Sequence, residues 1–324
     1  MAVIAIDTPT DAQLRQWHRV VVAACAHDQP DEPPLDFEQT RARLLVPKMA
    51  SRTLLWAEPG PDGDLAGVAY LRLPDDPDRA GEIDIHVRPE HRRGGIGTRL
   101  LAAAGGALRA GGCRTVFAQV VAGTPAVPFL EGRGFHCVLT LQSMLLRMAE
   151  VDPLEVARRV AEGRPGYRLR RWTGTVPNEL AGQLATAKIA MAEGEQFRWD
   201  AARVREMAGV VAARGDDLYT VAALHGPSAA PELAGFTEVV VPGAAPERAA
   251  QYDTAVVPEH RGRRLGIWLK AAMLDWLRAE RPEVAEIETD NADDNASMLA
   301  VNRELGFRGQ REYREYQADT ADLP

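Results

Sequence analysis

Two segments rich in glycine and arginine have the residue types and spacing to bind an anion in this chain of 324 residues. The first runs from Arg92 to Gly97 and the second from Arg261 to Gly266. Each follows a strand-like stretch and precedes a helical pattern. The first amides of such a helix lack partners within it, and glycines let an anion approach the backbone. We therefore predict that both segments bind a phosphate or pyrophosphate, with the arginines as further donors.

The two segments belong to a longer repeat. Asp84 and Asp253 are 169 positions apart, as are Arg92 and Arg261, and Val, Pro, Glu and His recur between them. A Gly-Phe pair recurs downstream, ending at Phe135 in the first copy and at Phe307 in the second. This pattern indicates a tandem duplication. We expect an N-terminal domain at 1–150, a linker at 151–166 and a C-terminal domain at 167–324.

Each copy has the pattern of a mixed α/β domain, in which helices precede and follow the strands that carry the loop. In the first copy we expect helices at 11–26, 37–45 and 96–109, and strands at 53–58, 65–73, 81–87, 115–121 and 138–147. In the second we expect helices at 176–191, 201–213, 265–278 and 296–305, and strands at 167–170, 218–224, 232–241, 251–257, 283–289 and 312–317.

Composition excludes several classes of function. The net charge of −8 argues against nucleic acid as the main partner, because phosphate neutralisation needs a basic surface. No apolar stretch is long enough to cross a membrane. The three cysteines cannot pair completely and lack the spacing of metal ligands, which favours a reducing, cytoplasmic setting and no metal. We expect a monomer or a homodimer.

The loops resemble the pyrophosphate motif of the GNAT superfamily of N-acetyltransferases, which is Arg or Gln, two residues, Gly, one residue, and Gly or Ala. Arg92, Gly95 and Gly97 satisfy it, whereas Arg264 occupies the place of the first glycine in the second loop. That side chain either points away from the pyrophosphate or contacts it. The layout is similar to tandem-GNAT proteins of the mycothiol-synthase type in architecture rather than in substrate.

The resemblance implies two tandem GNAT-like domains, each a mixed, mainly antiparallel sheet flanked by helices, that use acetyl-CoA or another acyl-CoA. It also implies that the strand before each loop separates from its neighbour and pairs with pantetheine. The residues implied to bind the cofactor are Ile85, His86, Val87, Arg92, Arg93, Gly94, Gly95, Ile96 and Gly97 in the first copy, and Thr254, Ala255, Val256, Arg261, Gly262, Arg263, Arg264, Leu265 and Gly266 in the second.

A second cofactor-contacting element distinguishes the copies. Asn291 and Asn295 precede a helix in the second copy and have the amides to bind acyl-CoA, although Asn295 is also a typical helix cap. In the first copy the residue matching Asn295 is Gly123, and prolines weaken the helix. The second copy therefore has the better second element and the poorer phosphate loop.

Catalysis of acyl transfer needs a base for the amine and a donor for the leaving thiolate. Glu238 is our preferred base because the first copy has Tyr70 there, and Asp253 is the other candidate. Glu82 is the alternative if the first copy reacts. The tyrosine that many GNAT enzymes use as the donor is replaced by Asn302 in the second copy, which is a poor acid, so protonation by water stays open. We expect His91 and His260 to lie at the surface.

The leading hypothesis is transfer of acetyl from acetyl-CoA to an amine of a small metabolite, by direct attack within a ternary complex. The alternative is a non-catalytic module that binds acyl-CoA. A nucleotide-binding protein of the P-loop or Rossmann type is disfavoured, because neither Gly-Lys-Ser/Thr nor Gly-x-Gly-x-x-Gly occurs at the loops.

Overall fold

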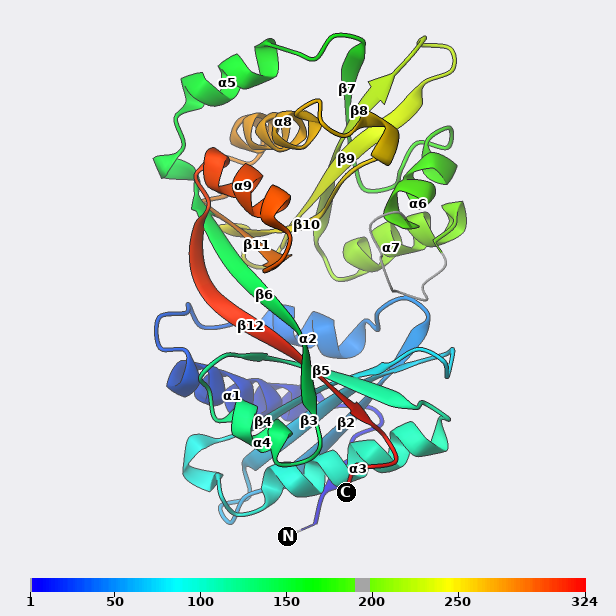
Figure 1. The fold of residues 1–324 in the computed structure, drawn as a ribbon. Coiled ribbons are helices and arrows are strands. Elements are labelled where there is room, and N and C mark those ends of the chain that lie inside the picture. Colours follow the sequence, from blue (N-terminus) through cyan, green and yellow to red (C-terminus); the bar gives the residue numbers. More distant parts are fainter. Residues whose placement is uncertain (1, 190–198) are drawn as a thin grey trace. The chain divides into compact units, whose positions relative to one another are not determined.

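The computed structural model describes residues 2–189 and 199–324 and divides the chain into two compact units. Unit 1 consists of Met1–Leu141 together with Glu312–Pro324, and unit 2 of Gln142–Arg311. Both units combine one sheet with flanking helices (Figure 1). The predicted mixed α/β fold is confirmed.

Unit 1 holds a sheet in which neighbours are antiparallel except for the parallel pair β4 and β5. Its order is β1 (Ile4–Ala5), β2 (Ser51–Pro59), β3 (Leu65–Pro74), β4 (Gly81–Val87), β5 (Thr115–Val121) and β12 (Arg308–Asp319). The helices are α1 (Asp11–Asp28), α2 (Phe37–Leu45), α3 (Ile96–Ala110) and α4 (Ala126–Glu131).

Unit 2 repeats this arrangement, again with one parallel pair, β10 and β11. Its order is β7 (Tyr167–Thr173), β8 (Asp217–His225), β9 (Glu232–Val241), β10 (Arg248–Val256), β11 (Glu286–Ala292) and the end of β6 (His136–Arg147). The helices are α5 (Pro153–Ala161), α6 (Ala181–Ile189), α7 (Ala201–Ala213), α8 (Leu265–Glu280) and α9 (Ala296–Leu305).

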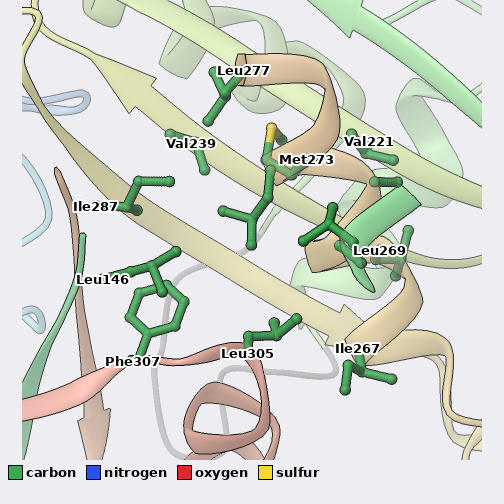
Figure 2. Packing of buried hydrophobic residues seen from close by; sticks show 14 of the residues in the cluster. Leu146, Val221, Val239, Ile267, Leu269, Met273, Leu277, Ile287, Leu305 and Phe307 are labelled. Atoms are coloured by element: carbon green, nitrogen blue, oxygen red, sulfur yellow. The ribbon is translucent and has the colours of Figure 1, made fainter. Parts of the chain in front are cut away.

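The last place in each sheet is filled by a strand from the other sequence copy. In unit 1, β12 pairs with β5 from Tyr313 opposite Val121 to Asp319 opposite Thr115. In unit 2 the end of β6 adds Leu146 to the core, where Figure 2 shows it beside Phe307. The compact units therefore do not coincide with the sequence copies, and the division of the duplication at 151–166 stays a prediction.

The core of unit 2 explains the firm placement of the second loop. α8 is apolar around most of its circumference, and Ile267, Leu269, Met273 and Leu277 are each at most 3% exposed. Figure 2 shows these side chains packed with Ile287 and Val239 of the sheet. Burial of a leucine-sized side chain contributes roughly 2 kcal/mol to stability. These contacts therefore hold α8, and with it the end of the second loop, firmly against the sheet.

Most expected elements are present, with three corrections. The strand expected at 283–289 runs from Glu286 to Ala292, after a turn in which the Val284 amide donates to the Arg281 carbonyl. The strand β1 was not predicted because it is only two residues long. The helix expected at 176–191 begins at Ala181, since Pro177 to Leu180 form a turn; its expected end lies outside the described residues. Within the described residues, no helix is long and apolar enough to cross a membrane.

Candidate active site

The two loops share one backbone conformation. Arg93 and Gly95 have positive φ angles of 65° and 79°, and Gly262 and Arg264, at the same two places, have 77° and 57°. Gly95 and Arg264 each directly precede their helix, and neither N-cap makes a side-chain cap among the described residues. The first-turn amides of α3 and α8 are therefore available to an anion.

Arg99 braces the first loop. Its guanidinium donates two hydrogen bonds, of 2.9 and 2.6 Å, to the buried carboxylate of Glu58 and a third, of 3.1 Å, to the carbonyl of Gly94. A Cβ on Gly95 would lie 2.8 Å from Arg99 Nη1, and one on Gly97 would lie 3.0 Å from the Phe129 ring. A side chain at Gly97 would displace the Phe129 ring, and one at Gly95 would displace the end of Arg99 and adopt a left-handed backbone.

The first arginine of the loop is already paired. Arg92 donates bidentate hydrogen bonds of 2.7 and 2.8 Å to Asp28 and a third, of 3.1 Å, to the carbonyl of Val87. Its counterpart Arg261 makes the equivalent bond of 3.2 Å to the carbonyl of Val256. Both side chains thus tie the loop to the preceding strand, and a direct contact with pyrophosphate stays a prediction.

Arg264 turns its side chain toward α9. Its Nη2 lies 2.5 Å from Glu304 Oε1, which Arg159 also contacts at 2.7 Å. The structure thus shows Arg264 paired with Glu304, and the absence of a contact between its side chain and pyrophosphate stays a prediction.

We expect Arg264→Gly to keep the affinity for acetyl-CoA within about twofold. Glycine relieves a left-handed backbone that costs other residues roughly 1 kcal/mol, while the lost ion pair is exposed and contributes less than about 1 kcal/mol. Calorimetric titration measures the affinity and urea unfolding the stability. A tenfold loss of affinity with unchanged stability would show that the Arg264 side chain contacts the cofactor.

The strands that lead into the loops separate from their parallel neighbours. Pairing of β4 with β5 covers Gly81 and Glu82, and pairing of β10 with β11 covers Arg248 to Ala250. Ile85 to Val87 and Thr254 to Val256 lie beyond these stretches and keep only the antiparallel partner on their other side. Each separated edge offers backbone groups to an extended, amide-rich ligand.

The asparagines near α9 differ in their surroundings. Asn295 caps α9 by accepting a 3.1 Å bond from the amide of Met298, which is the structural role that the sequence allowed. Asn291 is buried, and within the described chain its Nδ2 has no hydrogen-bond partner. Asn302 is fully buried and accepts a 2.7 Å bond from Lys270 Nζ. In unit 1 the matching helix, α4, is shorter and begins without a side-chain cap.

Comparison with known proteins agrees with this geometry. The model of the acetyltransferase (GNAT) family matches the chain twice, at residues 14–135 and 187–307. Each match contains one strand, loop and helix of the kind described above, and together they cover more than half of the chain. The chain belongs to the GNAT acetyltransferase family.

Individual relatives match most of the length of this GNAT protein. It is 29% identical over 241 residues to a mycothiol acetyltransferase of Tsukamurella paurometabola, covering 73% of this chain and 77% of the relative. A tandem GNAT protein from the clavulanic acid biosynthesis pathway has a TM-score of 0.82 and 28% identity, with 98% of both chains covered. A GNAT protein from Sphaerobacter thermophilus, with a TM-score of 0.72, 17% identity and 98% and 96% coverage, shares the fold.

The GNAT protein pairs its two candidate bases with one lysine. Lys188 Nζ lies 2.6 Å from Glu238 Oε2 and also donates to Asp253. Lys188 and Glu238 are each 1% exposed, whereas Asp253 is 36% exposed. The rings of Trp199 and Phe236 lie 5.0 and 5.1 Å from the ammonium. Asp253 is therefore the more accessible carboxylate.

Burial and charge set the ionisation of this cluster. Burial raises the pKa of Glu238, which Lys188 opposes, and the net shift is upward. Burial alone would lower the pKa of Lys188, but the two carboxylates raise it above its usual value. Lys188 is consequently a permanent cation that holds both carboxylates in place.

Two features of the GNAT protein were missed from sequence. Lys188 was not singled out, although a lone lysine in the apolar stretch of α6 and a glutamate within the largely apolar run 233–241 of β9 are the signal for such a pair. The expected exposure of His260 is wrong, because it is 5% exposed and its Nδ1 lies 2.9 Å from the Tyr167 hydroxyl. His91 is half-buried.

Proposed function

We propose that unit 2 transfers an acetyl group from acetyl-CoA to a primary amine of a small metabolite. The observation that carries the proposal is that β10 and the segment that follows it place three parts in succession. These are the partly exposed carboxylate of Asp253, the separated edge at Thr254–Val256, and the loop that opens α8. The names of the Tsukamurella relative and the clavulanic acid pathway protein both refer to small-molecule metabolism, which supports a small acceptor.

The reaction follows from these positions. The loop amides bind the pyrophosphate and the edge of β10 pairs with the pantetheine amides, so the thioester is held beside the acceptor. The amine nitrogen attacks the thioester carbon, the C–N bond forms and the C–S bond breaks. Asp253 takes the amine proton, the CoA thiolate takes a proton from water, and the hydroxide that is left takes the proton from Asp253. Asn302 stays a candidate donor to the sulfur.

The pairing of Glu238 changes its proposed role. A carboxylate that is sealed against Lys188 cannot accept a substrate proton without breaking a buried ion pair. Glu238 therefore acts by positioning Lys188, which in turn orients Asp253. This assignment replaces the earlier preference for Glu238 as the base.

The second candidate function is a non-catalytic module that binds acyl-CoA. The observation that favours it is the same sealed ion pair, because a structural salt bridge in place of a free base suits binding without turnover. A cytoplasmic setting, with no nucleic acid or membrane as partner, belongs to both proposals. The monomeric or homodimeric state also stays a prediction.

Introducing an aspartate into one loop at a time tests whether unit 2 carries out the acetyl transfer. Gly266 and Gly94 are the best sites, because a Cβ at Gly266 meets no atom within 4 Å and a Cβ at Gly94 meets only the His91 carbonyl, at 3.6 Å. Gly266→Asp should weaken acetyl-CoA binding to unit 2 at least about 100-fold through charge repulsion and abolish CoA release with an amine panel. Gly94→Asp should spare turnover.

The matched controls are Gly266→Ala and Gly94→Ala, which add a Cβ without a charge. Titration of acetyl-CoA into all four variants counts the working sites. Turnover that survives Gly266→Asp but not Gly94→Asp would move the reaction to unit 1. Binding of acetyl-CoA without CoA release for any amine would favour the non-catalytic module.

A further inference from the structure

Unit 1 contains a cavity of about 110 Å³ between α1, α2 and the strands β3 and β4. Trp17, Val21, Leu35 and Leu44 form its apolar walls, and we call it the α1–α2 pocket. An engineered cavity of about 150 Å³ is large enough to hold benzene. The α1–α2 pocket therefore has room for a short aliphatic group.

The other end of the α1–α2 pocket is charged. Arg43 Nη2 donates a 3.0 Å bond to Asp84 Oδ2, and His86 Nε2 lies 2.9 Å from Asp84 Oδ1. The Arg43 side chain is 49% exposed, and its guanidinium lies 5.0 Å from the Tyr70 ring. Burial alone would raise the pKa of Asp84, but His86 and Arg43 lower it below its usual range, so the carboxylate stays charged.

Donor groups remain free at this end. Arg43 uses only Nη2 toward Asp84, and within residues 2–189 and 199–324 no hydrogen bond engages its Nε, its Nη1 or the side-chain amide of Gln39. A guanidinium with an open side binds a carboxylate in a bidentate manner. Both groups line the α1–α2 pocket.

The equivalent place in unit 2 shows why the Arg43 guanidinium is accessible to a ligand. There Glu238 stands where unit 1 has Tyr70, and Lys188 is sealed between Glu238 and Asp253 at 1% exposure. Unit 1 has Tyr70 in place of that buried carboxylate, and its cation Arg43 is half exposed and borders a cavity instead of a packed core.

The charges select the kind of ligand. Arg43 and Asp84 cancel each other, so a simple carboxylate or a simple amine would leave a half-buried net charge, which is costly. A zwitterion adds no net charge and offers a carboxylate to Arg43 and an ammonium to Asp84. We propose that the α1–α2 pocket binds an aliphatic α-amino acid of about the size of leucine, with its carboxylate on Arg43 and Gln39, its ammonium on Asp84 and its side chain against Trp17 and Val21.

Binding of L-leucine to the full chain without acetyl-CoA tests this site separately from the proposed acetyl transfer. Saturation-transfer NMR and calorimetry should detect leucine. 4-Methylpentanoate lacks the amine and 3-methylbutylamine lacks the carboxylate, and each should bind at least about tenfold more weakly. L-Glutamate should bind at least about tenfold more weakly because its charge would enter the apolar part.

Leu35→Trp fills the α1–α2 pocket at a residue that is 45% exposed, so folding is spared. Leu45→Trp is the matched control, because Leu45 is 42% exposed on α2 and does not line the cavity. Leucine should bind wild type and Leu45→Trp with equal affinity and should fail to bind Leu35→Trp. Leucine binding that survives Leu35→Trp, equal affinity for 4-methylpentanoate, or no binding of leucine by wild type would each overturn the proposal.

Discussion

Lys188→Met should destabilise unit 2 by about 3–5 kcal/mol at neutral pH. Methionine has a similar length and fills the same apolar space, but it removes the cation from a glutamate that is 1% exposed. The charge of Glu238 is then buried without a partner. Asp253 contributes less to the loss because it is 36% exposed and can turn to water.

The pH dependence of this variant has a defined sign. Without Lys188, burial and Asp253 both raise the pKa of Glu238 above that of the unfolded chain. The folded variant then binds more protons than the unfolded one. Its stability should therefore rise as the pH falls toward the pKa of Glu238 in the unfolded chain. The deficit relative to wild type should be largest at neutral and alkaline pH.

The double variant Lys188→Met/Glu238→Gln is the control, because it removes both charges and should recover most of the lost stability. Urea unfolding read by hydrogen exchange of peptides from β9 and α6 reports on unit 2 alone. If Lys188→Met is as stable as wild type at neutral pH, or if the double variant is no better than the single one, the buried ion pair does not have this role.

The stability of unit 2 should rise with pH as the Lys270 ammonium loses its proton in the folded state. Lys270 is 2% exposed, and burial lowers its pKa to about 7. Its contacts are the Asn302 amide oxygen at 2.7 Å and the Phe307 ring at 5.2 Å. An unfolded lysine has a pKa near 10.4, so between these values the unfolded chain binds more protons and stability increases with pH.

Lys270→Met removes this dependence. At about 1.4 kcal/mol per pKa unit, the stability of wild type relative to the variant should rise by about 4 kcal/mol between about pH 7 and about pH 10. Urea midpoints of α8 peptides across this range measure it. Asn302→Asp is the second variant: it gives the ammonium a carboxylate, keeps it charged and should flatten the curve. If stability changes with pH in the same way for wild type and Lys270→Met, the pH dependence does not come from the buried Lys270 ammonium.

The repeat made the loops and most elements predictable. The constant spacing from Asp84 to Asp253 and from Arg92 to Arg261 located both strands, both turns and both helices before any geometry was known. It also showed that Arg264 of the second loop stands where the motif has its first glycine. The backbone explains the departure, because each loop needs two left-handed residues and contains one glycine and one arginine at these places.

What the sequence did not show depends on contacts between distant residues. The bidentate bond from Arg92 to Asp28 and the ion pair from Lys188 to Glu238 join separate elements, and no local pattern shows which residues meet. The same holds for the burial of His260 beside Tyr167. Local spacing therefore identifies side chains that can bind or react, but only the fold shows which of them already have a hydrogen-bond or ion-pair partner.

The place of β12 has a consequence for synthesis on the ribosome. Unit 1 needs Glu312–Pro324, which are translated after all of unit 2. Until then β5 lacks the neighbour that β12 provides, and the site where Tyr316 donates a 2.9 Å bond to Glu131 is empty. At roughly 5–20 residues per second the delay lasts on the order of ten seconds or more. The nascent first unit must therefore remain unfinished, with an open strand edge, while the second is being made.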